Sequence, residues 1–165
     1  KRVYKRLEAG HWEADTVVSG LGKSKACFVT LAERKTRYYI AMKLPDKRAD
    51  TVENGIVKLL SQFPSQLVKS ITCDRGTEFA NWANIEQRLN CDVYFAGPYC
   101  TWQKGSNENS NGLLREFYPK GRNLSRVAPA TLKRNLVLIN TRPRKVLGFR
   151  SAADLWASEL ALCCT

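Results

Sequence analysis

Three acidic residues, Asp15, Asp74 and Glu108, occupy positions from which their carboxylates could share metal ions. Carboxylate oxygens are the ligands that Mg²⁺ prefers in proteins, and basic residues around Glu108 suit a phosphate backbone. A simpler interpretation of Glu108 alone is also open, because the helix dipole favours an acid in a first turn by up to about 1 kcal/mol. Taken together, the three acids indicate metal-dependent phosphoryl transfer more strongly than any one of them.

Asp15 and Asp74 are each predicted to belong to a strand. Asp15 lies in HWEADTVVSG, residues 11–20, with Glu13 on the same face as a possible supporting acid. Asp74 ends the short apolar strand 68–73, a place where active sites of sheets with helical crossovers are usually built. The simpler alternatives are an edge-strand charge for Asp15 and a turn-initiating residue for Asp74.

Hydrophobic periodicity predicts the elements that must position these acids. Strands over 11–20, 25–32 and 37–44 form an antiparallel meander, which a helix over 49–63 follows. The strand 68–73, a helix over 79–89, the strand 92–96, a loop over 97–101, a helix capped by Ser106, and helices over 131–140 and 151–162 complete the chain. Crossover rules make the first, fourth and fifth strands parallel, so we expect Asp15 and Asp74 on neighbouring strands with Glu108 facing them.

The charge distribution predicts an anionic partner, with nucleic acid ahead of membrane. The 165 residues carry a net charge of +12 and have a pI near 9.7, in an otherwise ordinary globular composition. Residues 104–150 hold 11 Lys or Arg and 2 acids, and TRPRKVLGFR, residues 141–150, is expected to form an extended basic arm. The candidate DNA contacts are Lys104, Asn107, Arg115, Lys120, Arg122, Arg142, Arg144 and Lys145.

The cysteine pattern and the hydropathy bear on three further points: the state of the thiols, zinc binding and membrane association. The six cysteines form no CxxC pair and fall in apolar or strand-like runs, so we expect reduced core thiols. A zinc site is not expected, because His11 is the only histidine. No segment approaches 18 apolar residues and no signal peptide opens the chain, so we expect no membrane association.

The chain resembles the catalytic core of bacterial insertion-sequence transposases of the IS-thirty family, within the retroviral-integrase-like DDE superfamily. The resemblance covers roughly residues 6–156, and 33 residues separate Asp74 from Glu108. Cys73 stands where many relatives have Trp, which affects only local packing. The matching motifs are GHWEAD at 10–15, LAERKTRYY at 31–39, DRGTEFA at 74–80, WQKGSNENSNGLLREFYPKG at 102–121 and NTRPRKVLGFRSAADL at 140–155.

The resemblance implies an α/β, ribonuclease-H-like fold with a mixed five-stranded sheet of order 3-2-1-4-5 flanked by helices. It implies that Asp15, Asp74 and Glu108 are the DDE triad and hold two Mg²⁺ or Mn²⁺ ions about 3.5 to 4 Å apart. Water, then a freed 3′-hydroxyl, would attack DNA phosphodiesters in line, which amounts to strand cleavage followed by strand transfer.

The same resemblance implies one catalytic domain over residues 1–165, without the N-terminal helix-turn-helix region of relatives. It also implies a homodimer or higher oligomer when active, acting on transposon ends and target DNA in the bacterial cytoplasm at the nucleoid. Two alternatives remain open. One is a structure-selective nuclease of the same fold, and the other is a catalytically retired DNA-binding module.

Overall fold

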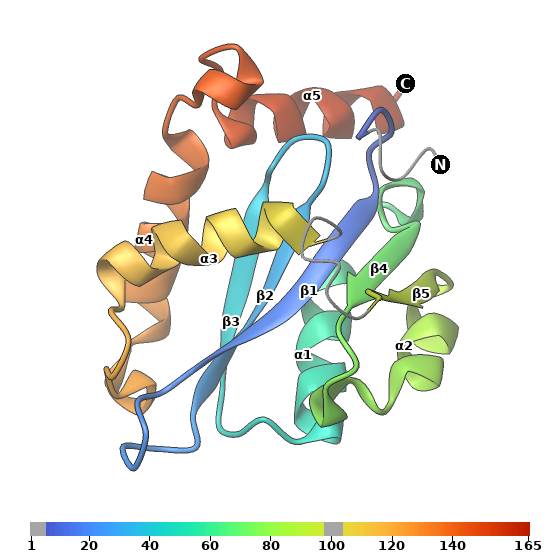
Figure 1. Ribbon diagram of the computed structural model, residues 1–165. Coiled ribbons are helices and arrows are strands. Elements are labelled where there is room, and N and C mark those ends of the chain that lie inside the picture. Colours follow the sequence, from blue (N-terminus) through green and yellow to red (C-terminus); the bar gives the residue numbers. More distant parts are fainter. Residues whose placement is uncertain (1–5, 98–103) are drawn as a thin grey trace.

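A mixed five-stranded sheet forms the centre of the protein, in the strand order β3-β2-β1-β4-β5 (Figure 1). The computed structural model describes residues 6–97 and 104–165. β1 pairs antiparallel with β2 and parallel with β4, while β2–β3 is antiparallel and β4–β5 parallel. The sheet order and the parallel set expected from the sequence are therefore confirmed. The strands are β1 (His11–Val18), β2 (Cys27–Glu33), β3 (Tyr39–Leu44), β4 (Ser70–Cys73) and β5 (Asp92–Phe95).

Within the described residues, five α-helices surround the sheet. Figure 1 shows α3 and α4 on one face, α1 and α2 on the other and α5 across one end. They are α1 (Ala49–Leu60), α2 (Trp82–Leu89), α3 (Gly105–Phe117), α4 (Pro129–Thr141) and α5 (Ala152–Cys163). Short 3-10 helices cover Ser65–Leu67, Thr77–Phe79, Leu124–Arg126 and Lys145–Leu147. The helix predicted over 79–89 is thus divided into Thr77–Phe79 and α2.

Two helix caps were predicted, and one of them is wrong. Ser151 caps α5 as expected, because its hydroxyl accepts a hydrogen bond from the Asp154 backbone N–H at 3.1 Å. Ser106 was expected to cap α3, but α3 begins at Gly105 and Ser106 lies inside its first turn, buried. The Ser106 hydroxyl instead accepts a hydrogen bond from Nη1 of Arg37, a long-range contact that local sequence does not encode.

The register of the central strands brings the two aspartates level with each other. Glu13 on β1 pairs with Thr72 on β4 in the parallel ladder. Two residues further along each strand, Asp15 stands beside Asp74, on the face to which Glu13 also points. Because β1 is the central strand, Asp15 is no edge-strand charge, which removes the simpler alternative considered for it.

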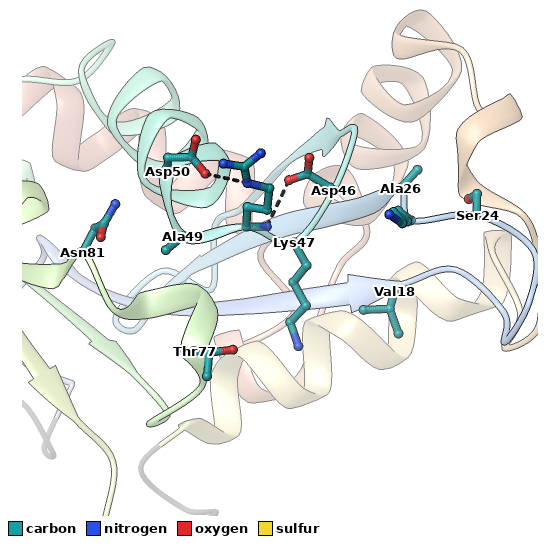
Figure 2. Close-up of a pocket in the computed structure, with 11 residues that line it drawn as sticks. Val18, Ser24, Ala26, Asp46, Lys47, Ala49, Asp50, Thr77 and Asn81 are labelled. Carbon is teal, nitrogen blue, oxygen red and sulfur yellow. Dashed lines mark hydrogen bonds and ion pairs between the residues drawn. The ribbon is translucent and has the colours of Figure 1, made fainter.

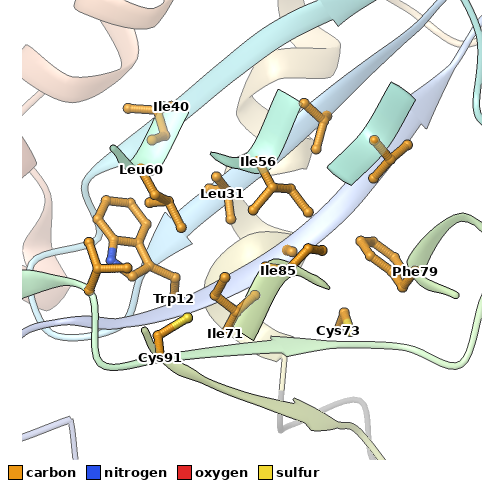
Figure 3. Close-up of a cluster of buried hydrophobic side chains, with 14 of the residues drawn as sticks. Trp12, Leu31, Ile40, Ile56, Leu60, Ile71, Cys73, Phe79, Ile85 and Cys91 are labelled. Atoms are coloured by element: carbon orange, nitrogen blue, oxygen red, sulfur yellow. The ribbon is translucent and has the colours of Figure 1, made fainter. Parts of the chain in front are cut away.

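Each face of the sheet buries its own hydrophobic cluster. On the α1 and α2 face, Trp12, Leu31, Ile56, Ile71 and other residues pack together, as Figure 3 shows. On the α3 and α4 face a second cluster forms around Phe28, Leu114, Tyr118, Leu124 and Ile139. β1 and β2 contribute to both clusters by alternation, so the sheet is held from both sides and β1 is fixed in place.

The segment after α4 is compact, so the extended arm expected over residues 141–150 is wrong. Pro143 and Ser151 form an isolated antiparallel bridge, and the Arg144 backbone N–H donates to the Arg150 carbonyl. Gly148 and Phe149 both adopt positive φ, which closes the loop tightly.

Three of the cysteines, Cys27, Cys73 and Cys91, are free and buried, as expected of core thiols. Burial raises the pKa of Cys73 to about 12, so this thiol beside Asp74 stays protonated at neutral pH in the metal-free chain. Cys163 and Cys164 are more accessible, and Cys100 lies outside the described residues, as does most of the loop expected over 97–101. In the described part of the chain, no helix is long and apolar enough to cross a bilayer.

Candidate active site

Asp15 lies on the central strand beneath α3 and has both of its carboxylate oxygens engaged. Oδ1 accepts a hydrogen bond from the Thr16 backbone N–H at 2.8 Å, and Oδ2 accepts one from Nδ2 of Asn111 at 3.1 Å. Burial raises the pKa of Asp15, while Lys104 and the Thr16 bond oppose the shift and the charge of Asp74 adds to it. A cation beside this carboxylate would therefore stabilise its charged form.

Asp74 follows β4 directly and is the more accessible of the two aspartates. Its Oδ1 accepts a hydrogen bond from the Gly76 backbone N–H at 3.0 Å, which orients the carboxylate. Its side chain is 51% exposed, compared with 30% for Asp15. Asp74 thus begins a turn, as its simpler interpretation required. Its second oxygen, Oδ2, contacts a residue that Asp15 also contacts.

That shared partner is Lys104, the residue before α3. Its Nζ lies 3.6 Å from Oδ1 of Asp15 and 3.5 Å from Oδ2 of Asp74. The lysine side chain is only 14% exposed, so its charge is directed at the two carboxylates rather than at solvent. Lys104 was expected to contact DNA or substrate near the metals. In this structure it joins the two aspartates, and its contact with DNA stays a prediction.

Glu108 projects from the first part of α3 and is exposed. It makes no hydrogen bond or ion pair with any residue that the structure describes. The helix that carries it is firmly placed. The Asn107 backbone N–H donates to Oε2 of Glu13 at 2.8 Å, and the Asn107 side-chain amide donates to the Glu13 carbonyl at 2.5 Å.

This arrangement gives Asn107 and Glu13 structural roles that their sequence positions did not reveal. Asn107 is fully buried and also accepts a hydrogen bond from the Thr30 hydroxyl, so its side chain faces the sheet and not a DNA-accessible surface. Glu13, expected as a supporting acid near the metals, forms a buried ion pair with Nε of Arg34 at 3.0 Å. Glu13 therefore anchors α3 and is neutralised by Arg34.

A relay of two polar side chains orients Asp15 from the far side. The buried Tyr39 hydroxyl donates to Oδ1 of Asn111 at 2.6 Å, which leaves the Asn111 amide N–H₂ to donate to Asp15. Burial raises the pKa of Tyr39, so this hydroxyl remains a donor at any ordinary pH. The relay fixes which way the Asn111 amide faces.

Glu78 is a fourth acid at this site, and sequence reasoning assigned it no role. It is buried, forms an ion pair with Nζ of Lys47 at 2.9 Å, and accepts a hydrogen bond from the Thr16 hydroxyl at 3.2 Å. A Cβ added at Gly76 would lie 2.2 Å from Oε2 of Glu78 and 2.9 Å from Oδ1 of Asp74. The only sequence signal for it was its position four residues after Asp74 in DRGTEFA.

Lys47 also lines an open groove beside the site, with a volume of about 840 Å³ (Figure 2). Figure 2 shows Lys47 extending toward Thr77. Arg48 also lines the groove; its backbone N–H donates to Oδ1 of Asp46 at 3.0 Å, and its Nε lies 3.4 Å from Oδ1 of Asp50. Lys25 completes a lining that contains three basic residues. The groove lining includes Thr77, which is three residues after Asp74 in the sequence.

The donor set can be compared with what a divalent cation needs. No three His, Cys, Asp or Glu side chains among residues 6–97 and 104–165 are grouped closely enough to hold a metal ion. Asp15 and Asp74 nevertheless converge on one position, where the Lys104 ammonium stands in for a cation. Hard carboxylate oxygens on adjacent strands fit Mg²⁺ or Mn²⁺, with Glu108 on the helix packed over β1 as the third candidate.

The remaining basic candidates divide by their surroundings. Arg115 donates to the Val18 and Tyr118 carbonyls, and the guanidinium of Arg122 lies over the Tyr118 ring. Arg142 is paired with Glu116 on the surface. Lys120 and Lys145 are exposed.

Arg144 differs from the other basic candidates because it is buried. Its Nη2 donates to the Ile139 carbonyl at the end of α4. Nearby Arg142 adds its charge to the effect of burial, and both lower the pKa of Arg144. Arg144 thus supports the end of a helix instead of extending into solvent.

The family model and the similar proteins point to the same family. The integrase core domain family matches residues 6–100. The probable transposase for insertion-like sequence element IS1161 of Streptococcus salivarius is 39% identical over 156 residues, which are 94% of this chain and 44% of that protein. The transposase InsI for insertion sequence element IS30A of Escherichia coli K12 is 36% identical over 162 residues, 98% of this chain and 42% of its own length. The chain therefore spans less than half the length of these relatives.

Solved structures agree on the fold. The catalytic core domain of BIV integrase superposes with a TM-score of 0.70 at 17% identity, covering 95% of this chain and 99% of that one. The simian T-cell lymphotropic virus intasome in complex with PP2A regulatory subunit B56 gamma contains a chain with a TM-score of 0.65 at 15% identity. That match covers 81% of this chain and 49% of the other. The ribonuclease-H-like fold expected from the sequence is therefore confirmed.

Proposed function

The chain belongs to the integrase core domain family and resembles the cores of IS30-type insertion-sequence transposases, and from this premise we propose that it catalyses DNA cleavage and strand transfer. The observation that carries the proposal is the convergence of Asp15 and Asp74, from neighbouring parallel strands, on one cationic position. A retired module would have little reason to keep two partly buried carboxylates facing each other. Such an arrangement is costly unless a cation occupies it.

In this proposal Asp15, Asp74 and Glu108 hold two Mg²⁺ or Mn²⁺ ions. When bound, the ions would supply activation of the attacking oxygen and stabilisation of the leaving oxygen in an in-line displacement. Asn111, Thr16 and Gly76 orient the two aspartates through the hydrogen bonds described above. Glu108 is exposed, and the first turn of its helix is anchored to Glu13. DNA can therefore reach Glu108 without unfolding of the helix.

Two successive reactions follow from this chemistry. In the first, a water oxygen forms a bond to phosphorus and the bond to the 3′ oxygen breaks, which leaves a 3′-hydroxyl and a 5′-phosphate. In the second, that 3′-hydroxyl attacks a target phosphodiester and frees a new 3′-hydroxyl, so one ester replaces another. Joining two transposon ends to one target requires at least a dimer, acting on DNA in the cytoplasm at the nucleoid.

Metal binding by the three carboxylates can be tested without catalysis. We expect Mn²⁺ to raise the melting temperature of this chain by mass action, and Asp15→Asn, Asp74→Asn and Glu108→Gln to reduce the increase. Glu116→Gln is the matched control, because it removes an exposed acid from the same helix as Glu108. If all five proteins respond equally to Mn²⁺, the three carboxylates do not form one site.

Activity separates the two alternative functions. Duplex ends with a pre-cut 3′-hydroxyl should be joined to target DNA with Mg²⁺ or Mn²⁺, and not with Ca²⁺, whose looser coordination suits in-line displacement poorly. A structure-selective nuclease would cut DNA without joining it. A retired module would bind DNA and leave it intact with every metal, and full activity in the presence of chelator would contradict the metal requirement.

A further inference from the structure

Lys104 occupies the position where a cation shared by Asp15 and Asp74 would bind. Its ammonium is within 3.6 Å of one carboxylate oxygen of each aspartate and has little exposure to solvent. Asp74 directs its Oδ1 to the Gly76 backbone and only its Oδ2 to Lys104. At Asp74, the oxygen that remains for a metal is therefore the one that Lys104 now contacts. At Asp15, Lys104 faces Oδ1, which also accepts the Thr16 backbone N–H.

An ammonium and a divalent cation cannot occupy this position together. Both carry positive charge, and at separations of a few ångströms inside a partly buried site their repulsion is large. Lys104 has a flexible four-carbon stem, so its side chain can rotate away while Asp15 stays in place on β1 and Asp74 stays at the end of β4.

We propose that Lys104 is a built-in competitor for the catalytic metal, and that its displacement couples metal binding to DNA binding. Without metal it balances the two aspartates and keeps the site together. When metal binds, the ammonium is released beside the position of the reacting phosphate, where a DNA phosphodiester can pair with it. Because coupling of two binding events is reciprocal, DNA that engages Lys104 should raise the affinity for metal.

This inference rests on the proposed function, since it assumes that Asp15 and Asp74 bind a divalent ion. The competitor role and a purely structural role of Lys104 predict opposite effects of its removal on metal affinity. Removing a structural ion pair would loosen the site and weaken metal binding. Removing a competitor should tighten it.

The experiment is calorimetric titration of Mn²⁺ into the wild-type chain, Lys104→Met, Lys104→Arg and the control Lys120→Met. Methionine keeps the length of the side chain without its charge, and Lys120 is an exposed lysine downstream of α3. We expect Lys104→Met to bind Mn²⁺ about tenfold more tightly than wild type, as expected when a partly buried ion pair no longer has to be broken. Lys104→Arg and Lys120→Met should resemble wild type.

A second titration adds a short random-sequence duplex. Wild type should bind Mn²⁺ more tightly with DNA present, and Lys104→Met should show little further gain. If wild type binds Mn²⁺ and Asp74→Asn abolishes that binding, but Lys104→Met binds no more tightly, the competitor role is wrong while the metal site stands. If neither wild type nor Lys104→Met binds Mn²⁺, both the competitor role and the proposed metal site are overturned.

Discussion

Burial of Asp15 opposes the charged form that a metal ligand needs. Desolvation raises its pKa above the ordinary value, so the ionised carboxylate is less favourable in the folded chain than in the unfolded one. A raised carboxyl pKa makes no contribution below the unfolded-state pKa of about 3.9, and destabilises the fold as pH rises through the folded-state value. Metal affinity and metal-free stability therefore place opposite demands on this residue.

The first prediction at this scale is that Asp15→Asn stabilises the metal-free chain at pH 7. We expect a gain on the order of 1 kcal/mol, as substitutions at active sites often give. The gain should shrink as the pH falls toward the pKa of an unfolded aspartate, because both proteins then carry a neutral side chain there. Chemical denaturation in chelator at several pH values measures it, and a gain that does not depend on pH would contradict the explanation.

The relay behind Asp15 gives a second prediction. Tyr39→Phe removes the hydroxyl that fixes the orientation of the Asn111 amide, while the ring stays in the hydrophobic cluster. We expect Mn²⁺ affinity to fall severalfold, with a loss of stability of about 1 kcal/mol for one buried hydrogen bond. Tyr94→Phe is the control, because Tyr94 is exposed on β5, and an equal loss of Mn²⁺ affinity in both variants would argue against the relay.

At the residue scale, the sequence predicted that Asp15 and Asp74 lie on neighbouring strands, but it did not predict their hydrogen-bond and ion-pair partners. Their positions followed from alternation along a strand and from the end of a strand, which are local patterns. Glu78, Asn111 and Lys47 belong to the site through contacts between residues that are 31 to 96 positions apart in the sequence. No short-range pattern encodes such contacts, and only the fold brings them together.

At the element scale, β3 is an edge strand whose outer side is covered by α4. The Asn140 side chain accepts from the Tyr39 backbone N–H at 2.9 Å and donates to the Tyr39 carbonyl at 2.7 Å. One amide thus takes the place of a neighbouring strand at this residue. Further along β3, Nζ of Lys43 donates to the Val127 carbonyl at 2.8 Å, which ties the strand to the turn before α4.

We predict that Asn140→Leu destabilises the chain by about 2 kcal/mol or more, because it leaves a buried backbone N–H and carbonyl of Tyr39 without partners. It should also promote association through the uncovered edge. Urea denaturation and light scattering measure the two effects. Thr141→Ala is the matched control on the same helix, since Thr141 is exposed and bonds only its own helix, and equal losses in both variants would contradict the edge-covering role.

The predicted elements agree with the structure wherever hydrophobic periodicity was strong, as in β1, α1 and α5. Local patterns failed where long-range contacts decide the geometry. TRPRKVLGFR is rich in charge and short of apolar periodicity, which favoured an extended arm, yet the Pro143–Ser151 bridge closes it into a loop. The start of α3 moved for the same reason, because Arg37 from the β2–β3 turn binds the Ser106 hydroxyl.

At the scale of the whole molecule, positive charge is concentrated in the last third of the chain. No acid stands between Glu116 and Asp154, although nine Lys or Arg residues do. This segment forms the end of α3, α4 and the loop after it, and α3 and α4 cover the face of the sheet opposite α1. The sequence alone showed this concentration of basic residues, but it could not show which of them are exposed.

The salt dependence of DNA binding tests whether the basic segment between Glu116 and Asp154 contacts DNA. Only its exposed basic residues are expected to contact phosphates. Log affinity for arbitrary duplex DNA should fall linearly with log salt, and each lost phosphate contact should reduce the slope by about 0.9. We expect this reduction for Lys145→Ala, which removes an exposed cation, without a change in sequence preference. Lys58→Ala is the control, because it removes the same charge from α1 on the opposite face.

Arg144→Ala should lower the free energy of unfolding and leave the slope nearly unchanged, because Arg144 is buried against the end of α4. A full unit of slope lost in Arg144→Ala with unchanged stability would show that Arg144 contacts a phosphate and does not act as a structural residue. Equal slopes for Lys145→Ala and Lys58→Ala would show that DNA does not bind across this loop.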